Sequence, residues 1–186
     1  MKLRKHQYEI QTLARYIGQK HNEAHPIIAS VTPGGGKSML PRILADELIP
    51  GFADYLCWVV PRNSLKSQGE ADFCASGSGQ VRAAENGADM RRGTLGYITT
   101  YQAIAADPEA HQLEQSAGRW IVFLDEPHHV VENGQWASAL GRLIDNAALV
   151  AYASGTLGRS DGQPIASVSQ LLADGIPGSD YYLVEY

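Results

Sequence analysis

The sequence predicts a single α/β domain on a mostly parallel sheet with helices on both faces, and three observations carry this prediction. The chain has 186 residues, an ordinary size for one such domain and short for two. Hydrophobic residues make up 44% and charged residues 19%, so the chain can build a core. Short apolar runs alternate with segments of helical period, as they do where parallel strands are covered on both faces.

Periodicity and turn residues locate the elements of the first half of the chain. A helix is expected where Ile10, Leu13 and Ile17 recur three or four residues apart. The run Ile27–Val31 is too short for a helix that buries one face, so it predicts a strand. Gly69 falls inside a later helix and weakens it. The expected elements are helix 6–20, strand 27–31, helix 39–48, strand 56–60, helix 63–75, a short strand near 81, strand 95–99 and helix 101–106.

The second half continues the alternation. The run Ile121–Leu124 is fully apolar and is the most strand-like segment of the chain. The segment 76–94, apart from the strand near 81, is rich in Gly, Ser and Ala and stays unassigned. No linker is long enough to divide the chain, so we expect one domain over 1–186. The expected elements are strand 121–124, helix 135–146, strand 149–153, a helix near 165–173 and a last strand near 181–184.

Composition excludes several classes of protein. No apolar run approaches the roughly 20 residues that span a bilayer, and the N-terminal segment lacks an apolar signal core. We therefore expect a cytoplasmic protein without a membrane partner. Cys57 and Cys74 form no CxxC pair, which argues against a structural zinc site of that type, and Cys57 is expected in the core. A net charge of −5 means that any binding of nucleic acid needs a local patch or another domain.

The strongest chemical signal is the glycine-rich segment 32–38, which lies between the expected strand 27–31 and the expected helix 39–48. Its glycines let backbone N–H groups curl around phosphate oxygens, and the helix N-terminus adds its positive dipole end. Lys37 can reach the β- and γ-phosphates of ATP, and the Ser38 hydroxyl can ligate Mg²⁺. Val31 stands where the general P-loop pattern has glycine, and a glycine-rich turn with a chance Gly-Lys-Ser is the alternative. The predicted ATP-binding residues are Thr32, Pro33, Gly34, Gly35, Gly36, Lys37 and Ser38.

Two carboxylates end the most strand-like run and provide the second signal. An apolar strand that ends in Asp125 and Glu126 delivers both to the carboxyl edge of the sheet, where open α/β folds bind ligands. Asp125 is expected to hold Mg²⁺ through water, and Glu126 to act as general base, with Lys37 as the second catalytic residue. A solvated acidic strand end is the alternative. Zinc at the following histidines is disfavoured because the run lacks HExxH spacing and Pro127 opposes a regular helix.

The two signals together resemble a known family. The run Asp125-Glu126-Pro127-His128 resembles the DExH form of the Walker B motif in superfamily two helicases and translocases. The P-loop is similar to the first motif of that superfamily, in which the leading position is often not glycine. The segment Leu3–Gln7 resembles the part that reads adenine, which implies that Gln7 contacts the base. The implied fold is a RecA-like P-loop NTPase domain.

Three weaker matches follow in the expected order. The segment from Val59 through Gln68 resembles motif Ia, and Thr99-Thr100-Tyr101-Gln102 is similar to a further strand-gripping motif. Ser154-Gly155-Thr156 resembles motif III, in which alanine usually stands in place of Gly155. The implied nucleic-acid contacts are Pro61, Arg62, Thr99 and Thr100. The implied coupling residues are His128, Ser154 and Thr156.

The resemblance runs from Leu3 to Asp161 and is closest to the type III restriction-subunit branch. Members of that family have two RecA-like domains, and the second supplies motifs IV to VI with the arginine fingers. The resemblance therefore implies that this chain is the first domain, completed by a second RecA-like domain in the same chain or a partner chain, and slow as an ATPase alone. Its implied partner is nucleic acid, with DNA favoured over RNA.

Some of these residues also have plain structural readings. Without the resemblance, Gln7 would be a surface residue of an amphipathic helix. Arg62 and Lys66 follow a strand and are either phosphate contacts or simply solvated charges. The basic pair Arg91-Arg92 lies in the unassigned stretch and is expected to be exposed to solvent.

The function implied is that of the motor domain of a DExH-type ATPase that acts on nucleic acid. Two alternatives from other classes remain. One is a module that binds nucleotide or nucleic acid without useful turnover. The other is a small-molecule kinase that uses the same P-loop, although kinases usually add an arginine-rich lid that is not found here.

Replacement of Lys37 by alanine tests the P-loop assignment. Lys37→Ala removes the point charge that meets the phosphates, so we expect a strong loss of Mg-ATP affinity in a protein that still folds. Titration calorimetry measures the affinity, and circular dichroism checks the fold. Unchanged affinity in the folded variant would contradict the assignment.

Overall fold

The computed structural model describes residues 3–20, 25–75, 77, 79–129, 135–155 and 181–185. The helix expected near 165–173 lies outside these residues. None of the helices in the described ranges has the length and apolar character that crossing a bilayer requires. In chain order the elements are α1 Lys5–Lys20, β1 Ile27–Ser30, the 3-10 helix η1 Lys37–Met39, α2 Leu40–Leu48, β2 Tyr55–Val60, α3 Asn63–Ala75, β3 Val81–Ala83, β4 Gly96–Thr100, α4 Tyr101–Ala106, α5 Pro108–Gln115, β5 Trp120–Asp125, the 3-10 helix η2 Pro127–His129, α6 Gln135–Asp145, β6 Leu149–Ser154 and β7 Tyr182–Glu185.

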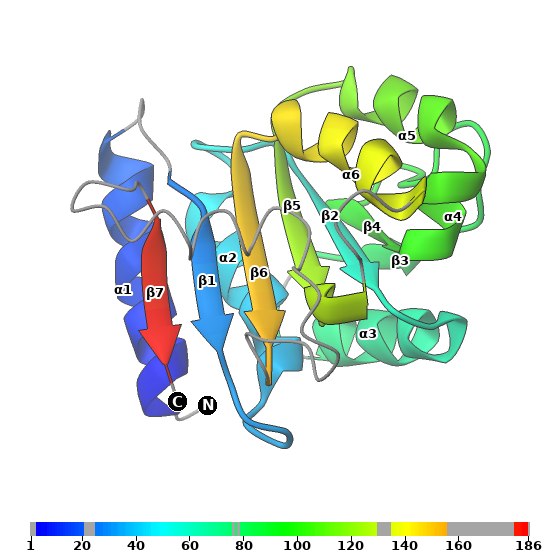
Figure 1. Ribbon diagram of the computed structural model, residues 1–186. Helices are drawn as coiled ribbons and strands as arrows, with labels where there is room; N and C mark the ends of the chain where they lie inside the picture. Colours follow the sequence, from blue (N-terminus) through cyan, green and yellow to red (C-terminus); the bar gives the residue numbers. More distant parts are fainter. Residues whose placement is uncertain are drawn as a thin grey trace.

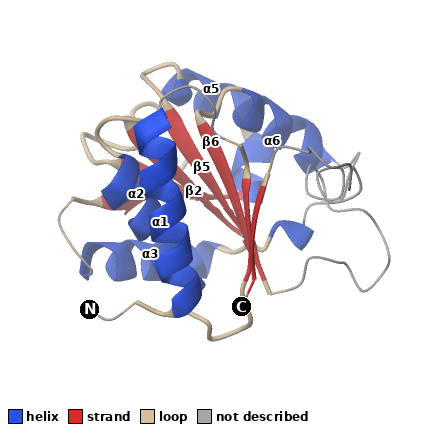
Figure 2. Cartoon of the chain, turned by 90° about the vertical axis from the view of Figure 1, so that its left-hand side faces the viewer, coloured by secondary structure: helices blue, strands red, loops and turns tan. Residues whose placement is uncertain are grey.

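Seven strands form one sheet in the order β3-β4-β2-β5-β6-β1-β7, and every neighbouring pair in it is parallel. Helices α1, α2 and α3 cover one face, and α4, α5 and α6 cover the other (Figures 1 and 2). The predicted α/β fold with helices on both faces is therefore confirmed. Because the strands are parallel, all their carboxyl ends lie at a single edge of the sheet.

Side chains of the central strands alternate between two cores. Leu56, Trp58 and Val60 of β2 belong to the cluster under α1, α2 and α3. Cys57 and Val59 of the same strand belong to the cluster under α4, α5 and α6. This period of two follows from the pleat of a strand, and burial on both faces explains why the predicted strands read as continuous apolar runs. The expected burial of Cys57 is confirmed.

The helix α5 was not expected from periodicity. The sequence signal for this helix lies at its start. Asp107 caps the helix by accepting a hydrogen bond from the Ala110 amide at 3.1 Å, and Pro108 is the first helical residue. Both features are typical of helix starts. The eight-residue helix is short, and its apolar period is too weak to be seen without these caps.

Gly69 interrupts the apolar pattern of α3 but does not break the helix. A Cβ built at Gly69 would lie 3.0 Å from two atoms of the Trp58 ring and 3.1 Å from Ile98. The missing side chain therefore lets α3 approach the sheet closely, directly over the buried Trp58. This packing offsets the low helix propensity of glycine.

Two buried cations fasten α3 to its neighbours. The Lys66 ammonium donates to the Ala84 carbonyl at 2.8 Å and to the Glu85 carboxylate at 2.6 Å, and Lys66 is only 4% exposed. On the other side, the Arg42 guanidinium of α2 donates to the Phe73 carbonyl at 3.4 Å and lies 4.9 Å from the centre of its ring. The interpretation of Lys66 as a solvated charge is therefore wrong, and its contact with a phosphate stays a prediction.

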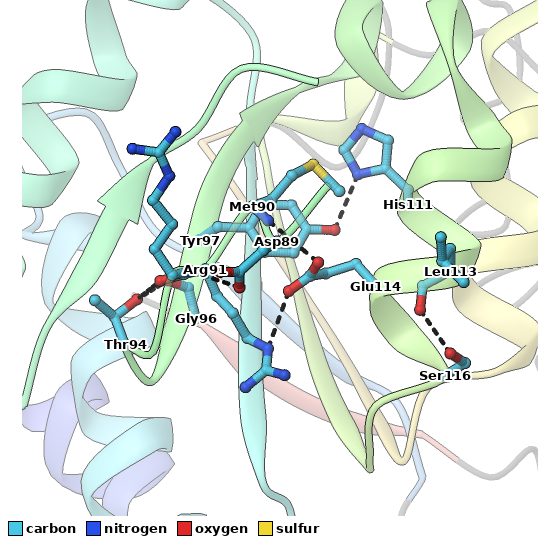
Figure 3. A network of polar contacts seen from close by, with 11 residues as sticks. Asp89, Met90, Arg91, Thr94, Gly96, Tyr97, His111, Leu113, Glu114 and Ser116 are labelled. Carbon is cyan, nitrogen blue, oxygen red and sulfur yellow. Dashed lines mark hydrogen bonds and ion pairs between the residues drawn. The ribbon is translucent and has the colours of Figure 1, made fainter. Parts of the chain in front are cut away.

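The loop after β3 is held by a partly buried ion pair, shown in Figure 3. Arg91 Nε donates to the Glu114 carboxylate at 2.9 Å, and the guanidinium lies 3.9 Å from the centre of the Tyr55 ring. The other carboxylate oxygen of Glu114 accepts from the Met90 amide at 3.2 Å. The expected solvent exposure of Arg91 is wrong, because its charge and its planar head are both used in packing.

His111 of α5 lies fully buried in the same region, beside Tyr97 (Figure 3). Its Nε2 is 3.2 Å from Asn86 Oδ1, and its Nδ1 is 2.9 Å from the Tyr97 hydroxyl. The Asn86 amide nitrogen donates to the Ala103 carbonyl, which fixes Oδ1 as an acceptor facing the histidine. Nε2 therefore carries the proton and Nδ1 accepts from Tyr97, which is a neutral ring. Burial lowers the pKa of His111 from 6.5 to about 4, with Asp107 acting weakly in the opposite direction.

The buried neutral ring predicts an acid-sensitive fold. Because the pKa of His111 is lower in the folded state, its contribution to stability is present above pH 6.5 and is lost as the pH falls toward 4. The linked loss is about 3 kcal/mol. Denaturant unfolding between pH 7.5 and 4.5 should show a smaller loss of unfolding free energy for His111→Gln than for the wild type. Equal losses in the two proteins would contradict the prediction.

Candidate functional site

Three adjacent strand ends bring the predicted chemical residues together. The order β5-β6-β1 sets β6 between the strand that carries Asp125 and the strand that precedes the P-loop. Ser154 ends β6 itself. Residues far apart in the sequence therefore meet at the carboxyl edge of the sheet, as expected for an α/β fold.

The P-loop turns tightly between β1 and η1. The Gly35 amide donates to the Thr32 carbonyl at 2.9 Å, and Gly36 has a φ of 87°, which favours glycine. Val31 is fully buried, and a Cβ on Gly35 would overlap its side chain. The valine at the position usually held by glycine is therefore accommodated by the bare backbone of Gly35. Thr32, Pro33 and Gly34 are exposed at the tip of the loop.

Gln7 of α1 reaches the P-loop and is only 5% exposed, so its reading as a surface residue is wrong. Its amide nitrogen donates to the Gly36 carbonyl at 3.1 Å, and its amide oxygen accepts from the Arg4 amide at 2.9 Å. The Arg4 guanidinium donates to the Gly34 carbonyl at 2.7 Å, a contact that sequence reasoning missed. The start of α1 therefore supports the loop directly, while contact of Gln7 with adenine stays a prediction.

Lys37 and Glu126 form an ion pair across the edge of the sheet. The other carboxylate oxygen of Glu126 accepts from the Ser154 hydroxyl at 2.8 Å and from the Gly155 amide at 3.3 Å. Burial alone would raise the pKa of Glu126, but the hydrogen bonds from Lys37 and Ser154 outweigh it and lower the pKa. Glu126 is thus ionised at neutral pH and held by groups that follow two other strands.

The backbone at Glu126 is strained. Its φ of 51° lies in the left-handed region, which costs a residue other than glycine about 1–3 kcal/mol. Such a conformation persists when the surroundings determine it, and the Glu126 amide donates to the Ala153 carbonyl at 2.8 Å. The strain lies at the residue predicted to be the general base.

His128 and the end of β6 complete this side of the site. His128 Nδ1 lies 3.1 Å from the Ser154 hydroxyl and 3.3 Å from a Glu126 carboxylate oxygen. A Cβ on Gly155 would lie 3.2 Å from Cδ of Pro33, so glycine suits the position where the helicase motif has alanine. Two of the three predicted coupling residues, His128 and Ser154, are therefore in contact, and Thr156 lies outside the described residues.

Asp125 ends β5 and lines a small pocket. Burial, and next the charge of Glu126, raise the pKa of Asp125 to about 6, with Lys37 acting in the opposite direction. Its Oδ1 is buried and has no hydrogen-bond partner among the described residues. Asp125 and Ser38 line one pocket of about 60 Å³, room for about two waters. An orphaned carboxylate oxygen and a hydroxyl beside space for water fit the oxygen-donor chemistry of Mg²⁺.

The four predicted nucleic-acid contacts lie at the ends of the neighbouring strands β2 and β4. Arg62 is exposed and Pro61 is partly exposed, whereas Thr99 and Thr100 are 1% and 3% exposed. The Thr100 hydroxyl caps α4 by accepting from the Ala103 amide at 3.1 Å. Only Pro61 and Arg62 of the four thus present side chains to solvent, and the contact of all four with nucleic acid stays a prediction.

Comparison with known proteins gives a family and a set of folds. A family model described as the res subunit of type III restriction enzymes matches residues 1–155. An uncharacterized protein of Mycobacterium tuberculosis is 30% identical over 172 residues, which cover 91% of this chain and 28% of that protein. The chain thus spans less than a third of the length of this relative.

Solved structures of helicases and restriction enzymes contain a similar fold. The Hef helicase domain of Pyrococcus furiosus matches with a TM-score of 0.68 and 15% identity, over 98% of this chain and 38% of that one. A nuclease-deletion mutant of the type ISP restriction-modification enzyme LlaGI, in complex with a DNA substrate mimic, matches with a TM-score of 0.64 and 14% identity, over 100% of this chain and 20% of that one. These likenesses show that the chain shares the fold of the RecA-like domains in these proteins.

The hydrogen bond from Ser154 predicts a measurable change in the acidity of Glu126. Ser154→Ala removes a donor that favours the ionised carboxylate, so we expect the pKa of Glu126 to rise. A carbon-13 NMR titration of the Glu126 carboxyl group measures it. Ser116→Ala, at the exposed end of α5, is the control and should leave the titration where it is. A Glu126 pKa that stays the same or falls in Ser154→Ala would refute the assigned donor.

Proposed function

The chain belongs to the family of type III restriction enzyme res subunits, and we propose that it is the ATP-binding first motor domain of a nucleic-acid helicase or translocase. The observation that carries this proposal is the ion pair between Lys37 and Glu126. It joins the amine expected to meet the phosphates to the carboxylate expected to activate water. A phosphate-binding loop and an ionised carboxylate within contact distance are the parts that ATP hydrolysis needs.

Different residues of the site bind the phosphates, the adenine and the Mg²⁺ of the nucleotide. Amides of the glycine loop and the Lys37 ammonium receive the phosphates, and Gln7, which already contacts the loop, reads the adenine. Ser38 and Asp125 would hold Mg²⁺, which when bound supplies positive charge to the phosphate oxygens. This role is supported by the buried Oδ1 of Asp125, which has no hydrogen-bond partner within the described part of the chain.

Binding of ATP exchanges one ion pair for another. In the structure Lys37 contacts Glu126, and the phosphates of ATP compete for the same ammonium. Glu126 then keeps its hydrogen bonds from Ser154 and Gly155 while one carboxylate oxygen becomes available. The hydrogen bonds from Ser154 and Gly155 also lower the pKa of Glu126, and they stay in place, so the carboxylate is still favoured in its ionised form and can orient and deprotonate the attacking water.

The nucleic-acid track is proposed along the ends of β2 and β4. Arg62 supplies an exposed positive charge there, and Thr99 and Thr100 lie at the neighbouring strand end. We favour DNA over RNA because a solved protein of similar fold was captured with a DNA substrate mimic. The net charge of −5 and the burial of Lys66 leave few phosphate contacts, so salt should weaken this binding readily.

A second RecA-like domain is proposed to complete the site. Arginine fingers of such motors stabilise charge on the transferred phosphoryl group and contribute about 10³–10⁵ in turnover. The relative from Mycobacterium tuberculosis is several times longer than this chain, which leaves ample length for such a domain. The alternative, a module that binds nucleotide without useful turnover, is distinguished by measuring ATP binding and hydrolysis separately.

The role of Glu126 is tested by removing its charge. Glu126→Gln keeps the shape and a hydrogen bond but removes the base, so the intact protein should bind ATP and hydrolyse it about 10²–10⁴ times more slowly. Steady-state hydrolysis with nucleic acid present measures the rate, and calorimetry measures ATP binding. Glu109→Gln, at an exposed site on α5, is the matched control and should keep the wild-type rate.

Two results would count against the proposal. Wild-type turnover in the folded Glu126→Gln variant would show that another group is the base. ATP binding without hydrolysis by the intact wild-type protein, with DNA or RNA present, would favour the binding module.

A further inference from the structure

The peptide group between Asp125 and Glu126 is held at both of its polar atoms. Its carbonyl oxygen, on Asp125, accepts a hydrogen bond from the Tyr101 hydroxyl at 2.9 Å. Its N–H, on Glu126, donates to the Ala153 carbonyl at 2.8 Å. The two partners come from the start of α4 and from β6, so this peptide plane cannot rotate without breaking one of the two bonds.

The orientation of this peptide plane decides where the Glu126 carboxylate lies. Glu126 has a left-handed φ of 51°, which an unconstrained glutamate rarely adopts. A backbone of this kind relaxes when the contacts that determine it are removed. The Tyr101 hydroxyl is one of those contacts, and it acts on the peptide group that immediately precedes the strained residue.

Tyr101 is itself rigidly held. It is 1% exposed, and its ring stacks on the Trp136 ring of α6 with centres 6.4 Å apart and planes 6° from parallel. Its backbone opens α4 directly after the capping residue Thr100. Burial, and then the charges of Asp125 and Glu126, raise the pKa of Tyr101 far above its ordinary value, so the hydroxyl stays a donor.

We propose that Tyr101 is a positioning residue for ATP hydrolysis: its hydroxyl clamps the Asp125 carbonyl and so holds Glu126 in the left-handed conformation that aims its carboxylate at the attacking water. The proposal rests on the proposed function, in which Glu126 is the general base. Tyr101 touches neither nucleotide nor water in this role. Its hydroxyl also ties the end of β4, where nucleic acid is proposed to bind, to the catalytic strand end.

Removal of the hydroxyl alone tests the clamp. Tyr101→Phe keeps the ring and its stack on Trp136, so the packing of the core is preserved. In the intact protein we expect kcat for ATP hydrolysis to fall by about tenfold or more, because small displacements of a catalytic group are costly, while Mg-ATP affinity stays within about twofold of the wild type. Affinity is unaffected because the P-loop and Lys37 are unchanged.

The matched control is Tyr97→Phe. Tyr97 lies on β4, is equally buried, and bonds through its hydroxyl to His111 at 2.9 Å, away from the carboxylates. Both variants lose one buried, hydrogen-bonded hydroxyl and should have a lower melting temperature, but Tyr97→Phe should keep the wild-type kcat. A kcat unchanged in Tyr101→Phe, or reduced equally in both variants, overturns the proposal.

A second measurement separates this proposal from the proposed function. Hydrogen exchange of the Glu126 amide reports the bond to Ala153 without any turnover, and it should be selectively faster in Tyr101→Phe than in Tyr97→Phe. If the wild-type protein hydrolyses no ATP, the proposed function fails. Hydrogen exchange of the Glu126 amide then tests by itself whether the Tyr101 hydroxyl holds the peptide group before Glu126. Equal exchange at Glu126 in the two variants overturns the proposal for Tyr101.

Discussion

The Glu126 carboxylate accepts hydrogen bonds from residues at the carboxyl ends of two other strands, and the rest of the site depends on this convergence. Lys37 comes from the loop after β1, and Ser154 and Gly155 come from the end of β6. The convergence is possible because the strands run in one direction and β6 lies between β1 and β5. A partly buried carboxylate is unfavourable unless it is paired and hydrogen-bonded, and here the partners come from the next two strands on that side of β5, which are β6 and then β1.

Charge and burial shift the pKa values of Asp125 and Glu126 in opposite directions. Asp125 and Glu126 are adjacent in sequence, yet the pKa of the first is raised to about 6 and the pKa of the second is lowered. The difference follows from the hydrogen-bond partners. Glu126 has a cation and two further donors, whereas one buried oxygen of Asp125 has no hydrogen-bond partner among the residues that the structure describes. Two neighbouring carboxyl groups whose pKa values are shifted in opposite directions are typical of functional sites.

Much of the fold and of the site could be predicted because the signals are local. The apolar runs, and a glycine loop between a strand and a helix, are read directly from neighbouring residues, and α3 was expected with the bounds that the structure has. What escaped prediction depends on tertiary partners. Lys66 is buried because its ammonium group donates hydrogen bonds to the Ala84 carbonyl and the Glu85 carboxylate in the loop after β3. Gln7 is buried because its side-chain amide donates a hydrogen bond to the Gly36 carbonyl.

The contact of Tyr101 with Asp125 escaped prediction for the same reason. Tyr101 stood in a motif expected to grip nucleic acid, and nothing in the sequence indicates that its hydroxyl turns toward a strand end 24 residues away. Pairing of this kind is set by the order of strands in the sheet. Local pattern does not encode that order, since β2 lies between β4 and β5.

The anchoring of α3 has a mechanical consequence. The helix presses on Trp58 through the bare backbone of Gly69, is tied to the β3–β4 loop by Lys66, and is tied to α2 by Arg42. Because α3 is held at Lys66, Gly69 and Phe73, it can neither rotate nor slide without breaking one of these contacts. A displacement of Arg62, which directly precedes the first turn of α3, would therefore move the sheet and α2 together with the helix.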